Sequence, residues 1–243
     1  MTISSTQYDT AFSKIQNLTW LPWVGSNFFQ RPAHKRLLVV GESHYFKNQA
    51  ECEERSKDTI YTRDVVSESL VDYEWTTPTL NNIPKLLFMK SSIEIDRARL
   101  WGDSAYYNFI QRPVDYNRDG LPERPTPDDF ITGWQTFIEV VRIIQPSHCL
   151  FIGVTAANSF NHAMSSPNLS FVPVVCTKKV GRTWARKARL EIDGTTTELC
   201  FVQHTGKYFR CSLWHDYLEA DQPGLMNWLD AESYTTKRDG LAA

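Results

Sequence analysis

Two short apolar runs, each followed by a glycine, constrain the fold of this chain more than any other feature of its sequence. Residues 36–40 precede Gly41, and residues 149–152 precede Gly153. Runs that are apolar on both faces are typical of central strands in a parallel sheet that helices cover on both sides. We expect further strands at residues 105–110, 171–176 and 199–203.

Helical patterns lie between these strands. Thr126, Pro127 and the two acids that follow are typical of a helix start, and apolar residues then recur at helical spacing as far as Pro146. Two more helices are expected at residues 155–164 and 212–219. The alternation of strand and helix indicates an α/β protein, specifically a three-layer α/β/α sandwich with a central, mainly parallel, four-stranded sheet.

The length of 243 residues favours a single domain over residues 1–243. Residues 1–34 form an N-terminal segment whose aromatic side chains, such as Trp20 and Trp23, are expected to pack against the sheet. The charge-rich region 50–75 is interpreted as a loop or helix inserted over the functional site, and the alternative is a solvated face.

Composition excludes several classes of protein. No apolar run approaches the roughly 18 residues of a membrane span, and the first residues lack the basic and apolar parts of a signal peptide. The five cysteines include no C-x-x-C pair, which argues against a disulfide framework and against a zinc or iron–sulfur site. We therefore expect a cytoplasmic protein without metal or cofactor, and we expect it to be a monomer. Cys149, Cys176 and Cys200 are expected to be small buried apolar residues.

A local run of positive charge favours a nucleic-acid partner, although the formal net charge of the chain is −2. Between residues 178 and 189 there are six cations and no acid. Such a cluster is expected to bind the phosphates of DNA, and the alternative is a solvated basic loop. The six residues are Lys178, Lys179, Arg182, Arg186, Lys187 and Arg189.

Polar or glycine-containing segments follow three of the expected strands. The first is residues 41–45 (GESHY), the second is Asn108 with Gln111 and Arg112, and the third is residues 204–206 (HTG). Ligands of parallel α/β sheets sit at the carboxyl ends of the strands. We therefore predict that these three strand ends form the functional site.

These segments, in this order, resemble the three motifs of the uracil-DNA glycosylase superfamily. The family's first motif is a strand followed by Gly-(Gln or Glu)-x-Pro-(Tyr or Gly), where x is any residue. Its last motif is His-Pro-Ser followed by an apolar residue. The stretch between them resembles a thermophilic bacterial branch, with an asparagine on a strand, Arg-Pro, Arg-x-Pro-Thr, and a later strand ending in Gly-x-x-Ala. The matching segments are residues 38–45, Asn108, 112–113, 124–129, 144–146, 150–156 and 204–209, and the likeness covers residues 20–218.

The resemblance implies the chemistry of base excision, in which the sugar becomes oxocarbenium-like and the base leaves as an anion. Glu42 would position water and stabilise the sugar, His204 would donate a hydrogen bond to the base oxygen, and Asn108 would read the base edge. Each residue also has a structural alternative. Glu42 could accept hydrogen bonds from nearby backbone N–H groups, His204 could be a hydrogen-bonded histidine at a strand end, and Asn108 could be an amide that orders a loop. The base pocket would comprise Gly41, Ser43, His44, Tyr45 and Phe46, with core packing as the alternative for Phe46. Lys207 and Tyr208 would bind DNA where the family inserts an apolar wedge.

The chain departs from the family pattern around the base. Ser43 and His44 replace motif residues, Thr205-Gly206 replaces Pro-Ser, and the iron–sulfur cysteines of the bacterial branch are missing. We therefore expect a modified cytosine of phage DNA as substrate, for example a glucosylated one, and a role in antiviral defence. Since Lys207 is the only lysine in the three strand ends, we expect a monofunctional hydrolase that leaves an abasic site. The alternatives are a repair glycosylase for uracil or another deaminated base, and a non-catalytic DNA-binding protein that retains the fold.

Overall fold

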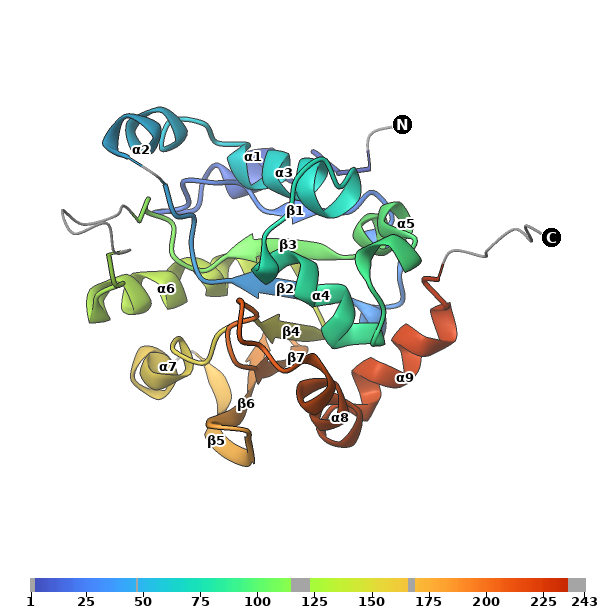
Figure 1. The fold of residues 1–243 in the computed structure, drawn as a ribbon. Helices are drawn as coiled ribbons and strands as arrows, with labels where there is room; N and C mark the ends of the chain where they lie inside the picture. The colour runs from blue at the N-terminus through green and yellow to red at the C-terminus, as the bar shows by residue number, and fades with distance from the viewer. Residues whose placement is uncertain (1–2, 47, 115–122, 166–168, 236–243) are drawn as a thin grey trace, which may run out of the picture.

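The computed structural model describes residues 3–46, 48–114, 123–165 and 169–235. Within these residues, seven strands form one mixed sheet in the order β1-β3-β2-β4-β7-β6-β5, flanked by helices (Figure 1). The protein is therefore α/β. The strands are β1 (Trp23–Val24), β2 (Leu37–Gly41), β3 (Ala105–Asn108), β4 (His148–Phe151), β5 (Ser170–Val180), β6 (Thr183–Ile192) and β7 (Thr195–Phe201).

The α-helices alternate with the parallel strands along most of the chain. They are α1 (Asp9–Phe12), α2 (Gln49–Arg55), α3 (Tyr61–Val65), α4 (Pro78–Phe88), α5 (Arg97–Asp103), α6 (Pro127–Ile144), α7 (Ala157–Ala163), α8 (Cys211–Asp221) and α9 (Pro223–Glu232). Single 3-10 turns cover Phe28–Gln30, Ala33–Lys35 and Ser92–Glu94, and a π-helical turn covers Val66–Val71. The predicted start of α6 is confirmed, because the Thr126 side chain accepts a hydrogen bond from the N–H of Asp129 and the Asp129 carboxylate accepts one from the N–H of Thr126.

The centre of the sheet consists of parallel strands, in the order β3, β2, β4 and β7. They lie where the sequence predicts strands at 105–110, 36–40, 149–152 and 199–203. The predicted sheet of four strands is nevertheless too small. In the described residues β1 adds to one side antiparallel to β3, and β6 and β5 extend the other side as antiparallel strands.

The basic run 178–189 lies on the β5–β6 hairpin and is not a loop. Strand β6 alternates buried residues such as Ala188, Leu190 and Ile192 with charged ones, so one of its faces packs on the protein. Asp193 and Gly194 connect β6 to β7 with φ angles of 49° and 77°. Positive φ at both positions is the geometry of a tight two-residue hairpin turn, for which Asp-Gly is a preferred sequence.

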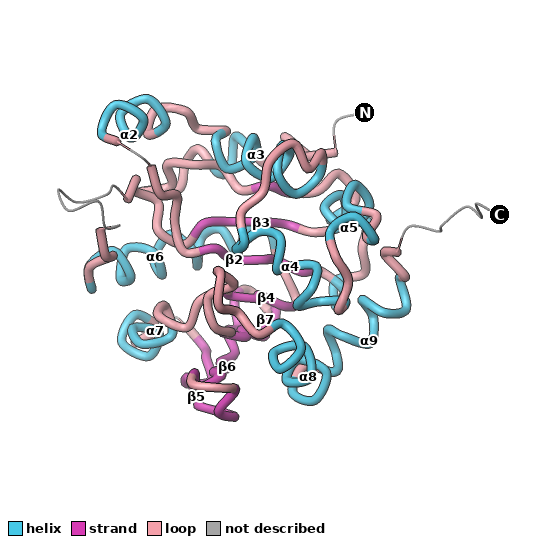
Figure 2. The backbone as a smooth tube through the Cα atoms, viewed as in Figure 1, coloured by secondary structure: helices cyan, strands magenta, loops and turns pink. Residues whose placement is uncertain are grey.

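Helices cover both faces of the sheet, so the strands have apolar side chains on each face (Figure 2). Leu37 and Val39 pack with residues of α4, α8 and α9, whereas Leu38 and Val40 pack with residues of α6 and α7. This alternation accounts for the continuous apolar run in β2, since both faces of a central strand are buried.

The inserted region 50–75 is largely helical, formed by α2, α3 and the π-helical turn. The Arg63 side chain donates to the Pro22 carbonyl and forms an ion pair of 2.6 Å with Asp9. These contacts attach the insertion to the N-terminal segment, where Trp20 and Trp23 are buried as expected. Figure 1 shows α2 on the side of the sheet toward which the parallel strands point.

Candidate active site at the carboxyl edge of the sheet

The carboxyl ends of the parallel strands, here called the carboxyl edge, hold the predicted site residues (Figure 1). Gly41 ends β2 and pairs in register with Asn108, which ends β3. Glu42 follows β2 directly, while Gly153 and His204 follow β4 and β7, the next two strands in the sheet. The parallel pairing therefore brings these residues to neighbouring strand ends.

Glu42 is half-buried and its carboxylate is oriented by a neighbouring phenol. The Tyr45 hydroxyl donates a hydrogen bond of 2.8 Å to Oε2 of Glu42, and the N–H of Ile110 donates to the Glu42 carbonyl at 2.8 Å. A cavity beside Glu42 measures about 10 Å³. That volume accommodates about one water molecule. Because a base is several times larger, the cavity has to open before a base can enter it.

Three phenylalanines that the sequence did not single out line this cavity together with Gly41, Glu42 and Gly153. They are Phe109, Phe130 and Phe151, and all three are buried. In the sequence they carry the signal of ordinary core residues. Phe109 and Phe151 reach the cavity from the ends of β3 and β4, and Phe130 reaches it from α6, so no local pattern could have identified the three together.

Asn108 points into the protein. Its side chain is buried, its Nδ2 donates to Nε2 of His44 at 2.9 Å, and its Oδ1 accepts from the Tyr106 hydroxyl at 3.4 Å. A Cβ atom on Gly41 would lie 2.3 Å from the same Oδ1, so this position requires glycine. These contacts match the loop-ordering alternative for Asn108 better than the reading of a base edge.

His44 is buried and neutral beneath the carboxyl edge. Burial lowers the pKa of its imidazole from 6.5 to about 3. Its Nε2 lies 2.8 Å from the Thr62 hydroxyl of α3, and its ring packs edge-on against Trp20. His44 therefore links the strand ends to the inserted region, and it does not line the cavity beside Glu42.

The lowered pKa of His44 predicts a pH dependence of stability. Unfolding restores the ordinary pKa, so the unfolded chain binds an extra proton below about pH 6.5, and stability falls from there toward about pH 3. Between about pH 7.5 and pH 5, this group should lower the free energy of unfolding by about 2 kcal/mol. Urea titrations of the wild type and of His44→Gln measure the difference. Equal decreases in both proteins would show that His44 does not titrate in this way.

Two other predicted base-pocket residues, Ser43 and Phe46, turn toward the protein as well, whereas Tyr45 is exposed beside Glu42. The Ser43 hydroxyl donates to the carbonyls of Ile110 and Arg112, at 3.3 and 3.1 Å. Phe46 is fully buried against Trp20, which leaves no ring face for a base. Phe46 is therefore a core residue and does not stack on a base.

His204 is exposed, in a loop that α4 holds in place. The Asn82 amide donates to the carbonyls of Thr205 and Gly206, at 2.8 and 3.2 Å, and the Thr205 hydroxyl donates to the Thr79 carbonyl at 2.9 Å. A Cβ atom on Gly206 would lie 3.0 Å from Nδ1 of His204, so glycine makes room for the imidazole. Asn82 was not predicted from the sequence, because an asparagine inside a helical pattern gives no signal of a distant loop.

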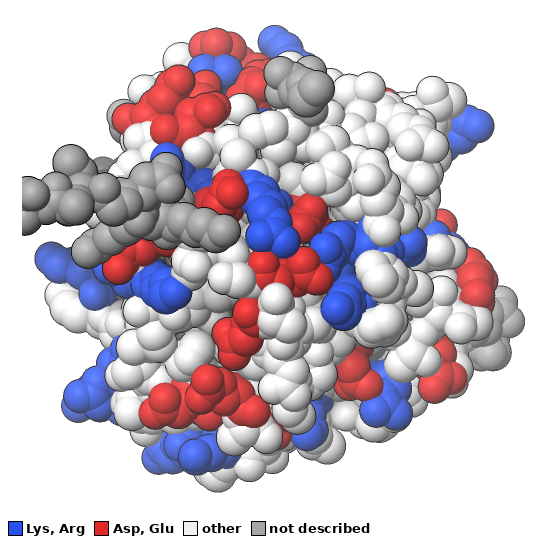
Figure 3. All heavy atoms as spheres, turned by 90° about the vertical axis from the view of Figure 1, so that its right-hand side faces the viewer, with Lys and Arg blue, Asp and Glu red and all other residues white. Residues whose placement is uncertain are grey.

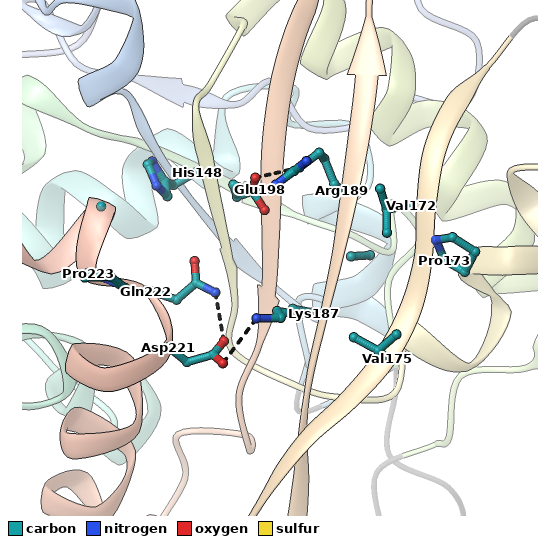
Figure 4. A pocket seen from close by; sticks show the side chains of 12 residues that line it. His148, Val172, Pro173, Val175, Lys187, Arg189, Glu198, Asp221, Gln222 and Pro223 are labelled. Atoms are coloured by element: carbon teal, nitrogen blue, oxygen red, sulfur yellow. Dashed lines mark hydrogen bonds and ion pairs between the residues drawn. The ribbon is translucent and has the colours of Figure 1, made fainter.

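Lys187 and Arg189, two of the predicted DNA-binding cations, are engaged elsewhere. Lys187 lies 3.2 Å from Asp221, and Arg189 donates to Glu198 at 2.7 Å. Figure 4 shows both pairs in a cavity of about 380 Å³ between β5 and the junction of α8 and α9. A phosphate would have to compete with these carboxylates.

Arg186 supports the loop that follows β4. Its guanidinium donates to the Val154 carbonyl at 3.2 Å and to the Asn158 side chain. That loop begins at Gly153, which lines the cavity beside Glu42. Arg186 therefore connects the hairpin to the candidate active site.

The remaining cations of the basic run form the tip of the β5–β6 hairpin. Because β6 runs antiparallel to β7, this tip lies at the carboxyl edge, and the Thr183 hydroxyl donates to the Gln203 side chain at 3.4 Å. The tip cations are exposed, and in the described part of the chain they have no ion-pair partner. They are Lys178, Lys179 and Arg182.

The opposite side of the molecule has a different charge pattern. Figure 3 shows acidic and basic side chains interspersed on the face beyond the amino ends of the parallel strands. There, Arg31, Lys35 and Arg99 all pair with Glu232. A mixed surface of this kind suits a phosphate backbone less well than the unpaired hairpin tip.

The described residues contain no group of three His, Cys, Asp or Glu side chains arranged to hold a metal ion. All five cysteines are free, and Cys176 is exposed, which corrects the expectation that it is buried. Among the described helices, none has both the length and the apolar character needed to cross a bilayer.

Two comparisons with known proteins give no match. A scan against protein-family models finds no family that matches the chain, and a search of the curated proteins finds no match. The resemblance to uracil-DNA glycosylases therefore rests on the three motifs and their spacing.

Proposed function

We propose that this protein is a monofunctional DNA glycosylase, which hydrolyses the N-glycosidic bond of a non-canonical pyrimidine and leaves an abasic site. The observation that carries the proposal is the joint position of Glu42, His204 and the unpaired hairpin-tip cations at the carboxyl edge. The order of the parallel strands, with helices on both faces, is consistent with a three-layer sandwich of the uracil-DNA glycosylase type.

The proposed reaction assigns one role to Glu42 and one to His204. The bond between C1′ and the base nitrogen breaks, and its electron pair leaves with the base. The Glu42 carboxylate stabilises the positive sugar and accepts a proton from the water whose oxygen bonds to C1′. His204 donates a hydrogen bond to the base oxygen on which negative charge develops. The proton held by Glu42 passes to the released base, so the products are a neutral base and an abasic sugar.

As substrate we propose a modified cytosine of phage DNA, such as glucosylated 5-hydroxymethylcytosine, which would make the protein a defence enzyme. Its support is a cavity of about 230 Å³ with several polar side chains in its wall, which also includes Ile110, whose N–H donates to the Glu42 carbonyl. Asn17, Thr19, Thr132 and Thr136 contribute amide and hydroxyl groups to its wall. A site that hydrogen-bonds the hydroxyls of a substrate discriminates strongly against analogues that lack them.

A panel of substrates tests this function. Oligonucleotides that carry uracil, 5-hydroxymethylcytosine or its glucosylated form are incubated with the protein and then treated with alkali, which cleaves abasic sites. We expect cleavage to be fastest for a modified cytosine. Release of uracil alone would favour the repair alternative.

A non-catalytic DNA-binding protein is the second candidate. It is favoured by the volume of the cavity beside Glu42, about 10 Å³, and by the commitment of the Asn108 amide to His44 and Tyr106. Binding of DNA without release of any base in the panel would support it.

The hairpin-tip cations give a prediction about binding. Replacing Lys178, Lys179 and Arg182 together by alanine should weaken DNA binding for all sequences, because these side chains have no ion-pair partner in the described residues. The slope of log affinity against log salt should flatten by about one unit for each phosphate that the variant no longer neutralises. The matched variant Lys187→Ala/Arg189→Ala should change this slope little, since both cations are paired within the protein. A slope unchanged in the triple variant would remove the tip from the DNA-binding surface.

A further inference from the structure

Two aromatic rings stand exposed beside the end of β7, at the carboxyl edge. Trp184, near the start of β6, is 49% exposed, and Tyr208, in the loop after β7, is 83% exposed. Large aromatic side chains are usually buried more completely than this, and an exposed ring keeps apolar surface in contact with water at a cost in free energy. Two such rings near one strand end indicate a surface that binds flat ligands.

The two rings lie on opposite sides of the end of β7. Side chains alternate along a strand, so Trp184 shares a face with Arg186, whose guanidinium contacts the loop leading into α7. Tyr208 belongs to the loop that α4 holds and that leads into α8. Helices α4 and α8 pack on the opposite face of the sheet from α7. A ligand that contacts both rings therefore crosses the carboxyl edge beside His204.

Positive charge accompanies both rings. The exposed Lys178 and Lys179 lie at the end of β5, where Lys179 pairs in register with Trp184, and Arg182 lies in the connecting turn. On the other side, Nζ of Lys207 lies 5.9 Å from the centre of the Tyr208 ring. Both rings thus combine a stacking surface with a cation for a phosphate.

We propose that this surface binds single-stranded DNA, in preference to a duplex, with bases stacked on Trp184 and Tyr208. The inference rests on the proposed function in taking DNA as the partner, and it adds the strandedness of the substrate. Aromatic rings on a basic surface are typical of single-strand binding, because every unpaired base offers a flat face to a ring. In a duplex these faces are covered by the neighbouring base pairs, so rings placed in this way would have no base to stack on without unstacking the helix. A strand that crosses between the rings also passes beside His204, at the end of β7, without prior separation of a base pair.

Fluorescence anisotropy with labelled oligonucleotides tests the proposal. The probes are a mixed-sequence DNA strand, the same strand annealed to its complement, and the same sequence as RNA, all at one salt concentration. We expect the DNA strand to bind at least about tenfold more tightly than the duplex, and more tightly than RNA. Trp184→Ala and Tyr208→Ala should each weaken single-strand binding roughly tenfold, the scale of removing one base–aromatic stack. Duplex binding should change little, and Trp184→Phe should retain most of the single-strand affinity.

Met89→Ala is the matched control, since this apolar side chain is 49% exposed at the far end of α4. Tighter binding of the duplex or of RNA, or unchanged single-strand binding in both aromatic variants, would overturn the proposal. Because this experiment measures binding and not excision, it tests the single-strand inference separately from the proposed glycosylase activity. Single-strand binding as described, without release of any base, would refute the glycosylase and leave this inference standing. If bases are excised only from duplex DNA, and if Trp184→Ala and Tyr208→Ala leave DNA binding unchanged, this inference is refuted and the glycosylase stands.

Discussion

Glu42→Gln should lower the rate of base excision by at least about a hundredfold, the usual scale for losing a positioned acid–base group. The substitution keeps the shape of the side chain and an oxygen that accepts the hydrogen bond from the Tyr45 hydroxyl. It removes the negative charge that stabilises the sugar cation and accepts a proton from water. DNA affinity should be unchanged, because the unpaired cations at the hairpin tip remain in place. Single-turnover rates with saturating enzyme measure the chemical step.

Tyr45→Phe is the control for this prediction. It removes the donor to Glu42 but leaves the carboxylate, so its effect on the rate should be much smaller than that of Glu42→Gln. If Glu42→Gln excises the base at the wild-type rate, Glu42 has no part in the chemistry and is a structural acceptor.

His204→Ala should reduce the single-turnover rate by about a hundredfold or more, since removing one donor to a developing oxyanion costs about 3 kcal/mol. The His204 side chain is exposed and the described residues give it no hydrogen-bond partner, so the thermal midpoint of unfolding should stay near that of the wild type. His204→Asn retains an N–H donor and should recover part of the rate.

Gly206→Ala tests the position of the same imidazole without removing it. A Cβ atom at Gly206 would lie 3.0 Å from Nδ1 of His204, so the ring would have to move. We expect a rate between those of the wild type and His204→Ala. A variant His204→Ala that is unfolded at ordinary temperature would support the structural alternative for this histidine.

The centre of the fold was predictable because its signals are local. The apolar run at 36–40 became β2 (Leu37–Gly41), and the threonine, proline and acids at 126–129 became the start of α6. The free energy that favours β2 comes from burial on both of its faces, and that which favours α6 comes from its capped start and from one buried face. Topology rules then place the ends of the parallel strands at one edge.

The strand predicted at 171–176 lies within β5 (Ser170–Val180), but β6 and its hairpin with β5 were missed because the charges obscured the pattern. Residues 183–192 alternate buried small or apolar side chains with cations, which is the pattern of a half-buried strand, and Asp193-Gly194 is a strong turn signal. These two features together could have predicted β6. The sequence could not have predicted which of the cations find an ion-pair partner among the described residues, because Asp221 and Glu198 come from other elements.

The sequence also could not predict the orientation of side chains at the strand ends. Asn108, His44 and Phe46 were expected to face the base, yet all three are buried, Asn108 against His44 and the other two against Trp20. Side chains alternate between the two faces of a sheet only while the backbone stays extended. Beyond the end of a strand, the direction of a side chain depends on its tertiary neighbours, such as Thr62 of α3 for His44. Position along the chain was therefore predictable, and direction was not.

The most direct measurement of the central claim is the identity of the products. Single-stranded and duplex DNA that carries glucosylated 5-hydroxymethylcytosine, 5-hydroxymethylcytosine or uracil is incubated with the protein, and the small molecules and the strands are analysed by mass spectrometry. The proposed function predicts a free modified cytosine together with an intact abasic strand, and neither product with Glu42→Gln. Recovery of every strand with its base in place, under conditions where the protein binds DNA, would contradict it.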